Sequence, residues 1–226
     1  MLPKIAVLSN NKEESLRLVS LFEKEGYQAL FFSDATKQTL DRILNVSPDI
    51  VLIDLDLEIT DGIEVCYFLR NEKKTNSFLL LFSDKNEEYI EIEAFKVGAD
   101  DYITKPINPR LFVRKIKAIL NRRKQNNEET EQKQLVFKDV TVDLDSYTVY
   151  KENKPTYLPR KDFEILQLFI LNPKKVYSRE EIYRIIWSTD EKFNPRIIDV
   201  HIRKIREKVG IYFIETIKGV GYRLAA

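Results

Sequence analysis

Three polar side chains that follow apolar runs in the first half of the chain have the chemistry needed for phosphoryl transfer. Asp54 follows IVLI, Ser83 follows FLLLF, and Lys105 follows YIT. A carboxylate supplies an oxygen nucleophile, an ammonium neutralises phosphoryl oxygens, and a hydroxyl donates a hydrogen bond to one of those oxygens. Taken singly, each residue has a plainer interpretation, since an aspartate can cap a loop and a lysine can be a solvated surface charge. The three act together only if the fold brings them to one place.

The elements that must position these residues alternate along the first half. Strand-length apolar runs alternate with stretches of helical spacing, which predicts a doubly wound α/β fold with a five-stranded parallel sheet. The expected strands are Ile5–Leu8, Ala29–Phe32, Ile50–Ile53, Phe78–Phe82 and Tyr102–Thr104. The expected helices are Glu13–Glu25, Ala35–Val46, Gly62–Arg70, Glu87–Val97 and Asn108–Arg123. Because the carboxyl ends of parallel strands share one edge of a sheet, we expect the three polar residues to converge there.

A polar stretch divides the chain. Residues 124–134 (KQNNEETEQKQ) contain no apolar side chain, so we predict a linker between a domain over 1–123 and another over 135–226. The second domain begins with short alternating runs and a turn at Glu152-Asn153-Lys154. Helical patterns and a terminal hairpin follow, which predicts an α+β winged helix-turn-helix domain. The expected helices are Lys161–Leu171, Ser178–Trp187 and Pro195–Val209, and the hairpin covers Phe213–Leu224.

The composition argues against several classes of protein. One cysteine, Cys66, cannot form an internal disulfide and is expected in the core, which favours a reducing cytoplasm. One Cys and one His leave a zinc site without enough ligands. No apolar run approaches the roughly 18 residues of a membrane span, and we expect no membrane partner. The second domain has 17 Lys and Arg against 13 Asp and Glu, while the rest has 20 against 23, which favours different partners for the two halves.

The quoted motifs resemble a known family. IVLIDLDLEITDGIEV, LLFSD and GADDYITKPINP resemble the receiver domain of bacterial response regulators, with the spacing of all three preserved. LPRKDFEILQLFILNP, YSREEIYRIIW, RIIDVHIRKIREK and ETIKGVGYRL resemble the winged-helix domain of OmpR/PhoB-type regulators. The resemblance implies a two-component regulator, not an enzyme, with Asp54 as phosphoacceptor and Lys105 as the phosphoryl-contacting lysine. It also implies Ser83 and Tyr102 as the switch hydroxyl and aromatic, and a cis peptide bond before Pro106.

The loop after the first strand departs from this family. Two adjacent acidic residues usually stand where this chain has Ser9 and Asn10. That acidic pair binds Mg²⁺, whose charge screens the phosphoacceptor from an incoming phosphate. Without it we expect Mg²⁺ to bind weakly at most, no other cofactor, and Lys105 as the counterion of the phosphoacceptor. Asp56 or Asp84 could restore a metal site in altered form, or could be solvated loop residues.

The helix expected at Pro195–Val209 has one apolar and one basic face. Its apolar stripe, expected to be buried, consists of Ile198, Ile202, Ile205 and Val209. The opposite face presents Arg196, Val200, Arg203 and Lys204, a set that suits the DNA major groove but is also found on solvated basic faces.

The resemblance assigns further DNA contacts. It implies that Val200, Lys204 and Arg206 face bases or their flanking phosphates, and that His201 and Arg203 touch the DNA backbone. For His201 a core hydrogen bond is the alternative. Thr216 is expected on a phosphate near the wing, and Lys218, at the hairpin tip, in the minor groove.

The resemblance also implies a homodimer through the last two helices and last strand of the first domain, with ion pairs between subunits. Asp101 with Arg122 and Asp100 with Lys115 are the expected pairs. Leu111 stands at a usually acidic position, where it either makes the interface more apolar or packs internally.

These observations favour a transcriptional regulator that binds promoter double-stranded DNA, on direct repeats, as a dimer, with RNA polymerase as a further partner. Phosphorylation of Asp54 is expected to matter weakly or not at all. The alternative is a conventional regulator phosphorylated on Asp54 by a histidine kinase. A protein-interaction module with a vestigial DNA-binding domain is a third hypothesis, and the intact GVGYR motif argues against it.

Overall fold

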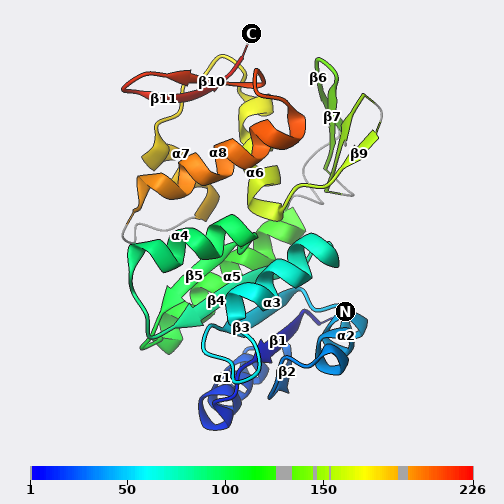
Figure 1. Ribbon diagram of the computed structural model, residues 1–226, viewed down its shortest axis with the longest axis vertical. Helices are drawn as coiled ribbons and strands as arrows, with labels where there is room; N and C mark the ends of the chain where they lie inside the picture. Colours follow the sequence, from blue (N-terminus) through cyan, green and yellow to red (C-terminus); the bar gives the residue numbers. More distant parts are fainter. Residues whose placement is uncertain (1, 126–133, 145–146, 153, 188–192, 226) are drawn as a thin grey trace. The chain divides into compact units, whose positions relative to one another are not determined.

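The chain forms two compact units, Met1–Asn121 and Arg122–Ala226, shown in Figure 1. The computed structural model describes residues 2–125, 134–144, 147–152, 154–187 and 193–225, with the side chains of 121–125 excepted. Most of the predicted linker lies outside the described residues. The neighbouring elements overlap its predicted ends, since α5 (Pro109–Gln125) includes Lys124 and Gln125 and β6 (Gln134–Phe137) begins at Gln134. Lysine and glutamine are good helix formers, so a polar composition alone does not end a helix.

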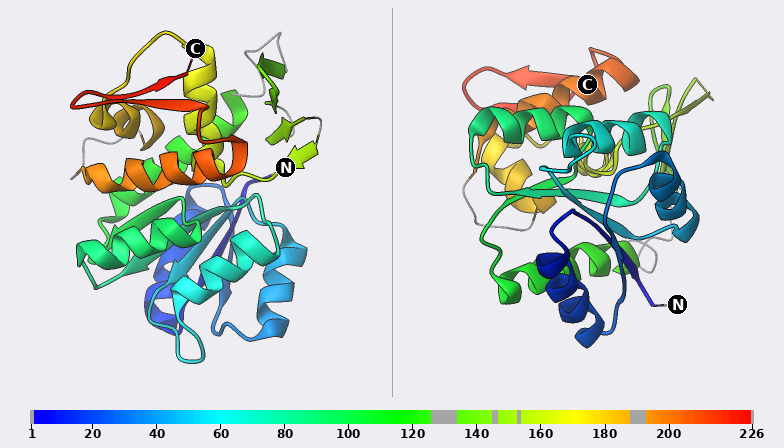
Figure 2. Two further views of the ribbon diagram at one scale, coloured as in Figure 1. Left: turned by 45° about the horizontal axis from the view of Figure 1, so that its top comes forward. Right: turned by 60° about the horizontal axis from the view of Figure 1, so that its bottom comes forward.

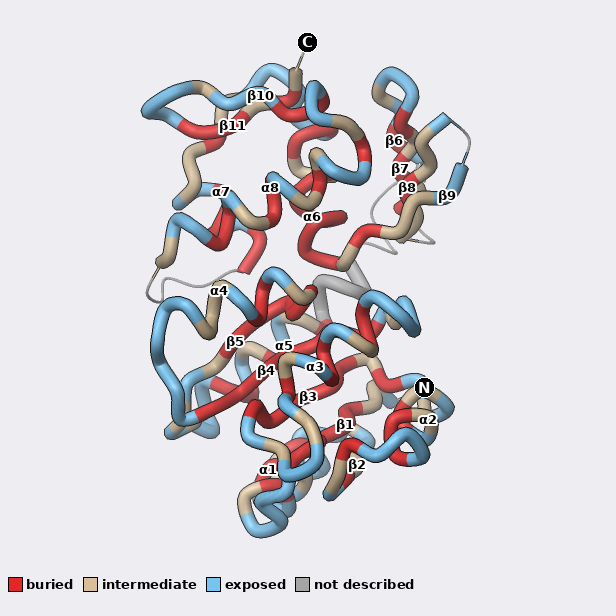
Figure 3. Tube along the Cα trace, in the orientation of Figure 1, coloured by how far each residue is buried: buried red, intermediate tan, exposed pale blue. Residues whose placement is uncertain are grey.

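The first unit is built on a five-stranded parallel sheet with the strand order β2-β1-β3-β4-β5. The two central strands β3 and β4 are buried along their whole length, as Figure 3 shows in red, which explains their continuous apolar sequences. The strands are β1 (Lys4–Leu8), β2 (Gln28–Phe32), β3 (Ile50–Asp54), β4 (Phe78–Ser83) and β5 (Asp101–Thr104). All five predicted strands are confirmed, with ends that differ by a residue.

Helices cover both faces of this sheet. The helices are α1 (Lys12–Lys24), α2 (Lys37–Val46), α3 (Gly62–Tyr67), α4 (Glu88–Val97) and α5. Figure 2 shows α1 and α5 on one face and α3 and α4 on the other. Under α1 and α5, Phe22 and Phe112 pack with ring centroids 5.6 Å apart in one apolar cluster with the strands. The doubly wound α/β prediction is therefore confirmed.

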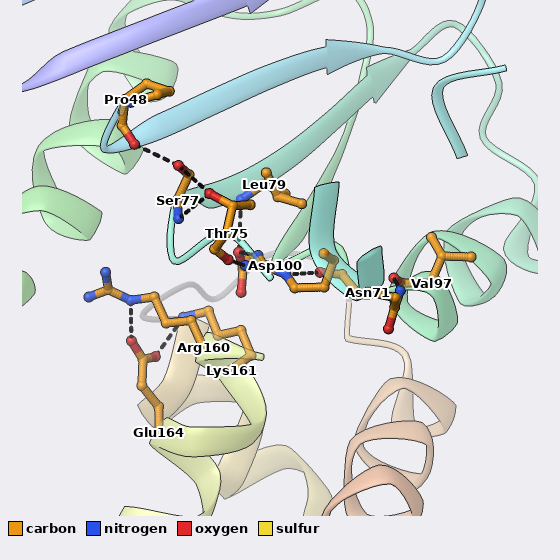
Figure 4. A network of polar contacts seen from close by, with 12 residues as sticks. Pro48, Asn71, Thr75, Ser77, Leu79, Val97, Asp100, Arg160, Lys161 and Glu164 are labelled. Atoms are coloured by element: carbon orange, nitrogen blue, oxygen red, sulfur yellow. Dashed lines mark hydrogen bonds and ion pairs between the residues drawn. The ribbon is translucent and has the colours of Figure 1, made fainter. Parts of the chain in front are cut away.

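The predicted helix Gly62–Arg70 differs in its last turn. After α3 the chain continues as a π-helix over Phe68–Glu72, and Arg70 within it is fully buried. Its guanidinium donates to the carbonyl of Gly98 at 2.9 Å and to the carboxylate of Asp100 at 2.5 Å. Figure 4 shows Asp100 beside Leu79, whose amide donates to the same carboxylate at 2.8 Å. A buried guanidinium is costly unless its donors are paired, and these acceptors pair it.

The second unit has the predicted winged-helix order. An antiparallel sheet of four strands comes first, followed by three helices and a hairpin. The strands are β6, β7 (Val140–Asp143), β8 (Thr148–Lys151) and β9 (Lys154–Thr156), and Asn153 of the predicted turn lies outside the described residues. The remaining elements are α6 (Arg160–Leu171), α7 (Arg179–Trp187), α8 (Pro195–Val209), β10 (Ile214–Ile217) and β11 (Gly221–Leu224).

Two local features place α8 and the hairpin. Asn194 caps α8, since its side chain accepts from the amide of Arg196, and Pro195 takes the first helical position. Gly221 lets β11 approach the segment before α7, because a Cβ there would lie 2.0 Å from the carbonyl oxygen of Tyr177. The predicted stripe of α8 is confirmed, as its four members are all buried: Ile198, Ile202, Ile205 and Val209. Trp187 and Cys66 are buried as predicted.

Within the described residues, no helix combines the length and apolar character needed to cross a bilayer.

Candidate functional site

The carboxyl edge of the sheet brings the three predicted residues together. Asp54 ends β3, Ser83 ends β4 and Lys105 follows β5. Asp54 and Ser83 are buried, with 3% and 0% of their surface exposed. Lys105 Nζ lies 3.1 Å from Asp54 Oδ2, so the lysine is the counterion of this carboxylate, as predicted. The peptide bond between Lys105 and Pro106 is cis, as predicted.

Ser9 presents a hydroxyl to Asp54 at this edge. Its Oγ donates to Asp54 Oδ2 at 2.7 Å and accepts from the amide of Asn11 at 3.1 Å. Ser9 is fully buried, whereas Asn10 is exposed. A neutral hydroxyl at 2.7 Å donates a hydrogen bond to the Asp54 carboxylate, whereas a second carboxylate at that distance would have no proton to donate.

A second carboxylate reaches Lys105 from α1. Glu14 Oε2 lies 2.9 Å from Lys105 Nζ, so the ammonium bridges Glu14 and Asp54. Burial acts to lower the pKa of Lys105, but the hydrogen bonds and charges of these two carboxylates outweigh it and raise the pKa above its usual value. The ammonium also lies 4.8 Å from the centre of the Phe82 ring. Sequence reasoning missed Glu14, whose only local signal is an Asn11-x-x-Glu14 capping pattern.

The residues present do not fit the Mg²⁺ ion that the family resemblance implies. Asp56, one of the two aspartates that could supply a further charge, is paired with Lys85, whose Nζ lies 2.6 Å from Asp56 Oδ1. The hydrogen bond and charge of Asp56 raise the pKa of Lys85. Asp84 is exposed. Across the described part of the chain, no group of three His, Cys, Asp or Glu side chains is arranged to hold a metal.

The predicted switch residues lie beside this edge. Ser83 Oγ accepts from the amide of Lys85 at 3.1 Å, and the Tyr102 hydroxyl donates to the carbonyl of Lys85 at 2.7 Å. Burial raises the pKa of Tyr102. The two predicted switch residues therefore hold the same loop residue, Lys85. Gly62 lets the start of α3 lie close to the backbone of Asp54, because a Cβ at this position would lie 2.4 Å from the Asp54 carbonyl oxygen.

The second unit presents most of the predicted DNA-contacting residues on α8 and at the hairpin tip. Arg196, Arg203 and Lys218 are exposed, and Val200 and Lys204 are partly exposed. Arg203 pairs with Glu207 at 2.8 Å along the helix, and its side chain remains 82% exposed. These side chains offer positive charge to solvent, as an interface with phosphate requires.

Two of the residues predicted to contact DNA, His201 and Arg206, make hydrogen bonds inside the fold. The backbone contact expected of His201 is wrong, because the side chain is 1% exposed and its Nδ1 lies 2.5 Å from Asp162 Oδ1. The core hydrogen bond left open for His201 is confirmed. The contact of Arg206 with bases or their flanking phosphates stays a prediction, and without DNA the half-buried side chain bonds within the fold. Its guanidinium donates to the carbonyl of Ile214 at 2.6 Å and to Thr216 Oγ1 at 2.8 Å, and so ties β10 to α8.

A polar cluster missed by sequence reasoning fixes the other side of the hairpin. The Tyr222 hydroxyl donates to Asp199 Oδ1 at 2.7 Å and accepts from Arg179 Nη2 at 2.9 Å. Arg179 Nε also donates to Asp199 at 2.6 Å. Burial, followed by the hydrogen bond to Asp199, raises the pKa of Tyr222 to about 12. The cluster joins α7, α8 and β11, and so positions the wing relative to the basic helix.

One of the two predicted dimer pairs, Asp100 with Lys115, is wrong. Asp100 is fully buried and bound to Arg70, so it cannot pair with Lys115 of another subunit. Lys115 pairs with Asp101 of its own chain, at 3.0 Å. The Arg122 side chain lies outside the described residues. Leu111 is 55% exposed, so it does not pack internally within the described part of the chain.

Comparisons with known proteins agree with this architecture. A model described as the response regulator receiver domain matches residues 5–117, and one described as the C-terminal domain of transcriptional regulatory proteins matches residues 153–224. Transcriptional regulatory protein ResD of Bacillus subtilis (strain 168) is 32% identical over 97% of this chain and 95% of its own. The alkaline phosphatase synthesis transcriptional regulatory protein PhoP of the same organism is 33% identical over 98% and 96%.

Solved structures show the same fold. A variant of the protein RitR superposes with a TM-score of 0.79 at 23% identity, over 98% of both chains. The response regulator DrrB of Thermotoga maritima, described as an OmpR/PhoB homologue, has a TM-score of 0.50 at 28% identity over the full length of both.

Proposed function

The chain belongs to the response regulators that join a receiver domain to a C-terminal DNA-binding domain, and on this premise we propose that its receiver acts with weak or no dependence on phosphorylation of Asp54. Such proteins are transcriptional regulators rather than enzymes.

The hydrogen bond from Ser9 to Asp54 carries the proposal. Two unit charges 4 Å apart repel by about 4 kcal/mol near a protein surface, so a phosphate dianion approaches Asp54 only if a cation screens it. Ser9 and Asn10 contribute no negative charge with which to hold a divalent cation. Lys105 is a single charge, and Glu14 and Asp54 already share it. The chemistry of the site therefore favours an unmodified aspartate.

The DNA-binding unit supplies the output. We propose that α8 enters the major groove of promoter DNA with Lys204 toward the bases, and that Lys218 at the hairpin tip enters the minor groove. Both side chains have access to solvent. We also propose a dimer bound to direct repeats. The exposed apolar side chain of Leu111 in the first unit supports it, because such a side chain could be buried between two subunits. RNA polymerase is the expected partner once the regulator is on DNA.

A conventional regulator phosphorylated by a histidine kinase is the second candidate. The observation that favours it is the convergence of Asp54, Ser83 and Lys105 at one edge of the sheet. They would supply the nucleophile, the hydroxyl and the cation for phosphoryl transfer. The conventional mechanism would then need only a cation that screens Asp54 from the incoming phosphate.

Binding measurements on one duplex distinguish the candidates. The duplex is first enriched from a random library on the wild-type protein, and its affinity is then measured with and without acetyl phosphate and Mg²⁺. We expect the same affinity for wild type and Asp54→Asn under both conditions, and weaker binding for Lys204→Ala. An affinity gain with acetyl phosphate that Asp54→Asn lacks would establish the conventional mechanism. Failure to enrich any duplex would favour the interaction module.

A further inference from the structure

We propose that Glu14 is a positioning residue that, with Asp54, holds the Lys105 ammonium as a built-in cation at the edge where the family uses a divalent metal. The site lacks the ligands for a metal, yet it contains two carboxylates that converge on one positive group. The positive charge at this edge would then belong to the chain and not to an ion from solution.

The geometry of Lys105 supports this role. Its Nζ lies 2.9 Å from Glu14 Oε2 and 3.1 Å from Asp54 Oδ2, both within the range of charge-assisted hydrogen bonds. The Lys105 side chain is only 11% exposed, and that of Glu14 is 29% exposed. Salt in solution screens ion pairs that are shielded to this degree less than it screens ion pairs on the open surface.

The local structure of α1 shows that Glu14 is committed to Lys105 and not to its own helix. Asn11 caps α1, and its side chain accepts from the amide of Glu14 at 3.1 Å. In a complete capping box the carboxylate of Glu14 would return to the amide of Asn11. That amide donates instead to Ser9 Oγ at 3.1 Å. Ser9 thus takes the place of Glu14 at the cap, and the Glu14 carboxylate bonds to Lys105.

The arrangement has a consequence for any anion that reaches the site. Two carboxylates and one ammonium leave a net charge of −1 among these three groups, which repels phosphate. A phosphoryl oxygen that approaches Lys105 must also displace Glu14 from it. Glu14 therefore sets the resting arrangement of Lys105 and opposes its use by a phosphoryl group. This inference deepens the proposed function and rests on it only for the statement that Asp54 is normally unmodified.

The test measures the reactivity of Lys105 with an amine-acylating reagent, resolved by residue with mass spectrometry, in the full-length protein. Only the neutral amine reacts, so Lys105 released from Glu14 should react faster and at lower pH. We expect Glu14→Gln to raise the Lys105 rate several-fold and to shift its pH–rate profile toward lower pH. Glu13→Gln is the matched control, because Glu13 lies in the same helical turn but pairs with the exposed Arg17.

Further variants keep the test decisive if Glu14→Gln fails to fold. Glu14→Asp retains the charge on a shorter side chain and should give a smaller increase, while Glu14→Gln with Asp54→Asn should exceed either single variant. An unchanged Lys105 rate in folded Glu14→Gln, or an equal increase in Glu13→Gln, would overturn the inference. The assay contains neither phosphodonor nor DNA, so its failure is distinguishable from failure of the proposed function.

Discussion

Ser9 Oγ donates a hydrogen bond to Asp54 Oδ2 over 2.7 Å in the interior of the receiver. A neutral hydroxyl therefore bonds to the Asp54 carboxylate at a position where the family resemblance leads us to expect an acidic residue. Since Ser9 is also held by the amide of Asn11, its hydroxyl is fixed as a donor toward Asp54. The loop after β1 thus holds the Asp54 carboxylate through a hydrogen bond, and the prediction for Ser9 and Asn10 rests on this bond.

Restoring the acidic pair should restore the phosphorylation chemistry. We expect the double variant Ser9→Asp with Asn10→Asp to gain Mg²⁺-dependent incorporation of phosphoryl groups from acetyl phosphate, because carboxylates supply the ligands that Mg²⁺ prefers. Intact mass with and without Mg²⁺ measures the gain. The triple variant that also carries Asp54→Asn should incorporate none. A double variant that stays unmodified at millimolar Mg²⁺ would mean that another feature blocks the site.

Lys204 on α8 should contribute to DNA affinity through its charge and its place in the groove. We expect Lys204→Ala to weaken specific binding by about 1 kcal/mol or more and to reduce the salt dependence of binding. Lys174→Ala is the matched control, since Lys174 is exposed in the turn between α6 and α7 and does not belong to α8. Titration of a labelled duplex at two salt concentrations measures both effects. Equal losses in the two variants would indicate nonspecific charge attraction.

Arg206 should stabilise the wing. Its guanidinium donates to Ile214 O and Thr216 Oγ1, and hydrogen bonds to charged groups contribute about 1.5–3 kcal/mol each. We expect Arg206→Ala to lower the free energy of unfolding by an amount in this range, and amide exchange in β10 to accelerate. Arg203→Ala, on the exposed side of the same helix, should change stability little. Unchanged exchange in β10 would contradict the anchoring role.

Asp100 should be a folding residue and not a dimer contact. Removing one partner of a buried ion pair costs about 3–5 kcal/mol, because the other charge is left without compensation. We therefore expect Asp100→Asn to destabilise the receiver by that amount in urea unfolding, with the oligomeric state of the remaining folded protein unchanged. Glu93→Gln, which breaks the exposed pair with Lys96, serves as control. An Asp100→Asn variant as stable as the wild type would show that Arg70 is compensated by other groups, and a change from dimer to monomer would contradict the folding role.

Asp34 should make the stability of the receiver depend on pH in the acid range. Hydrogen bonds from the Thr36 and Thr39 hydroxyls and the Thr36 amide lower the pKa of Asp34 from 3.8 to about 2. Because the folded pKa lies below the unfolded value, this stabilisation is present above pH 3.8 and is lost as the pH falls through about 2. Carboxyl carbon NMR measures the pKa directly. Asp34→Asn should lack this component of the pH dependence, and an ordinary pKa in the wild type would contradict the network.

Sequence reasoning predicted the periodic features of single strands and helices better than the side-chain contacts between elements that are distant in the chain. The five strands and the buried stripe of α8 follow from apolar periodicity, which local sequence contains. Lys105 as counterion of Asp54 followed from the shared edge of a parallel sheet. The bridge from Glu14 to Lys105 depends on the path of two side chains from distant elements, which spacing does not encode.

The helical spacing of α8 contains information on His201 and Arg206 that the family resemblance does not. His201 lies three residues after Ile198 and four before Ile205, so helical spacing already placed it at the edge of the buried stripe. Arg206 lies four residues after Ile202 and is directed toward the hairpin for the same reason. Asp100 was assigned to the dimer by family position, whereas its burial depends on Arg70, a residue from a different element.

The most direct test of the central claim is the intact mass of the wild-type protein after incubation with acetyl phosphate and Mg²⁺, with Asp54→Asn treated in parallel. We predict no mass gain in either protein, in samples that still bind the enriched duplex. A gain of one phosphoryl group in the wild type that Asp54→Asn lacks would contradict the claim, and would show that the hydroxyl of Ser9 does not prevent Asp54 from accepting phosphate.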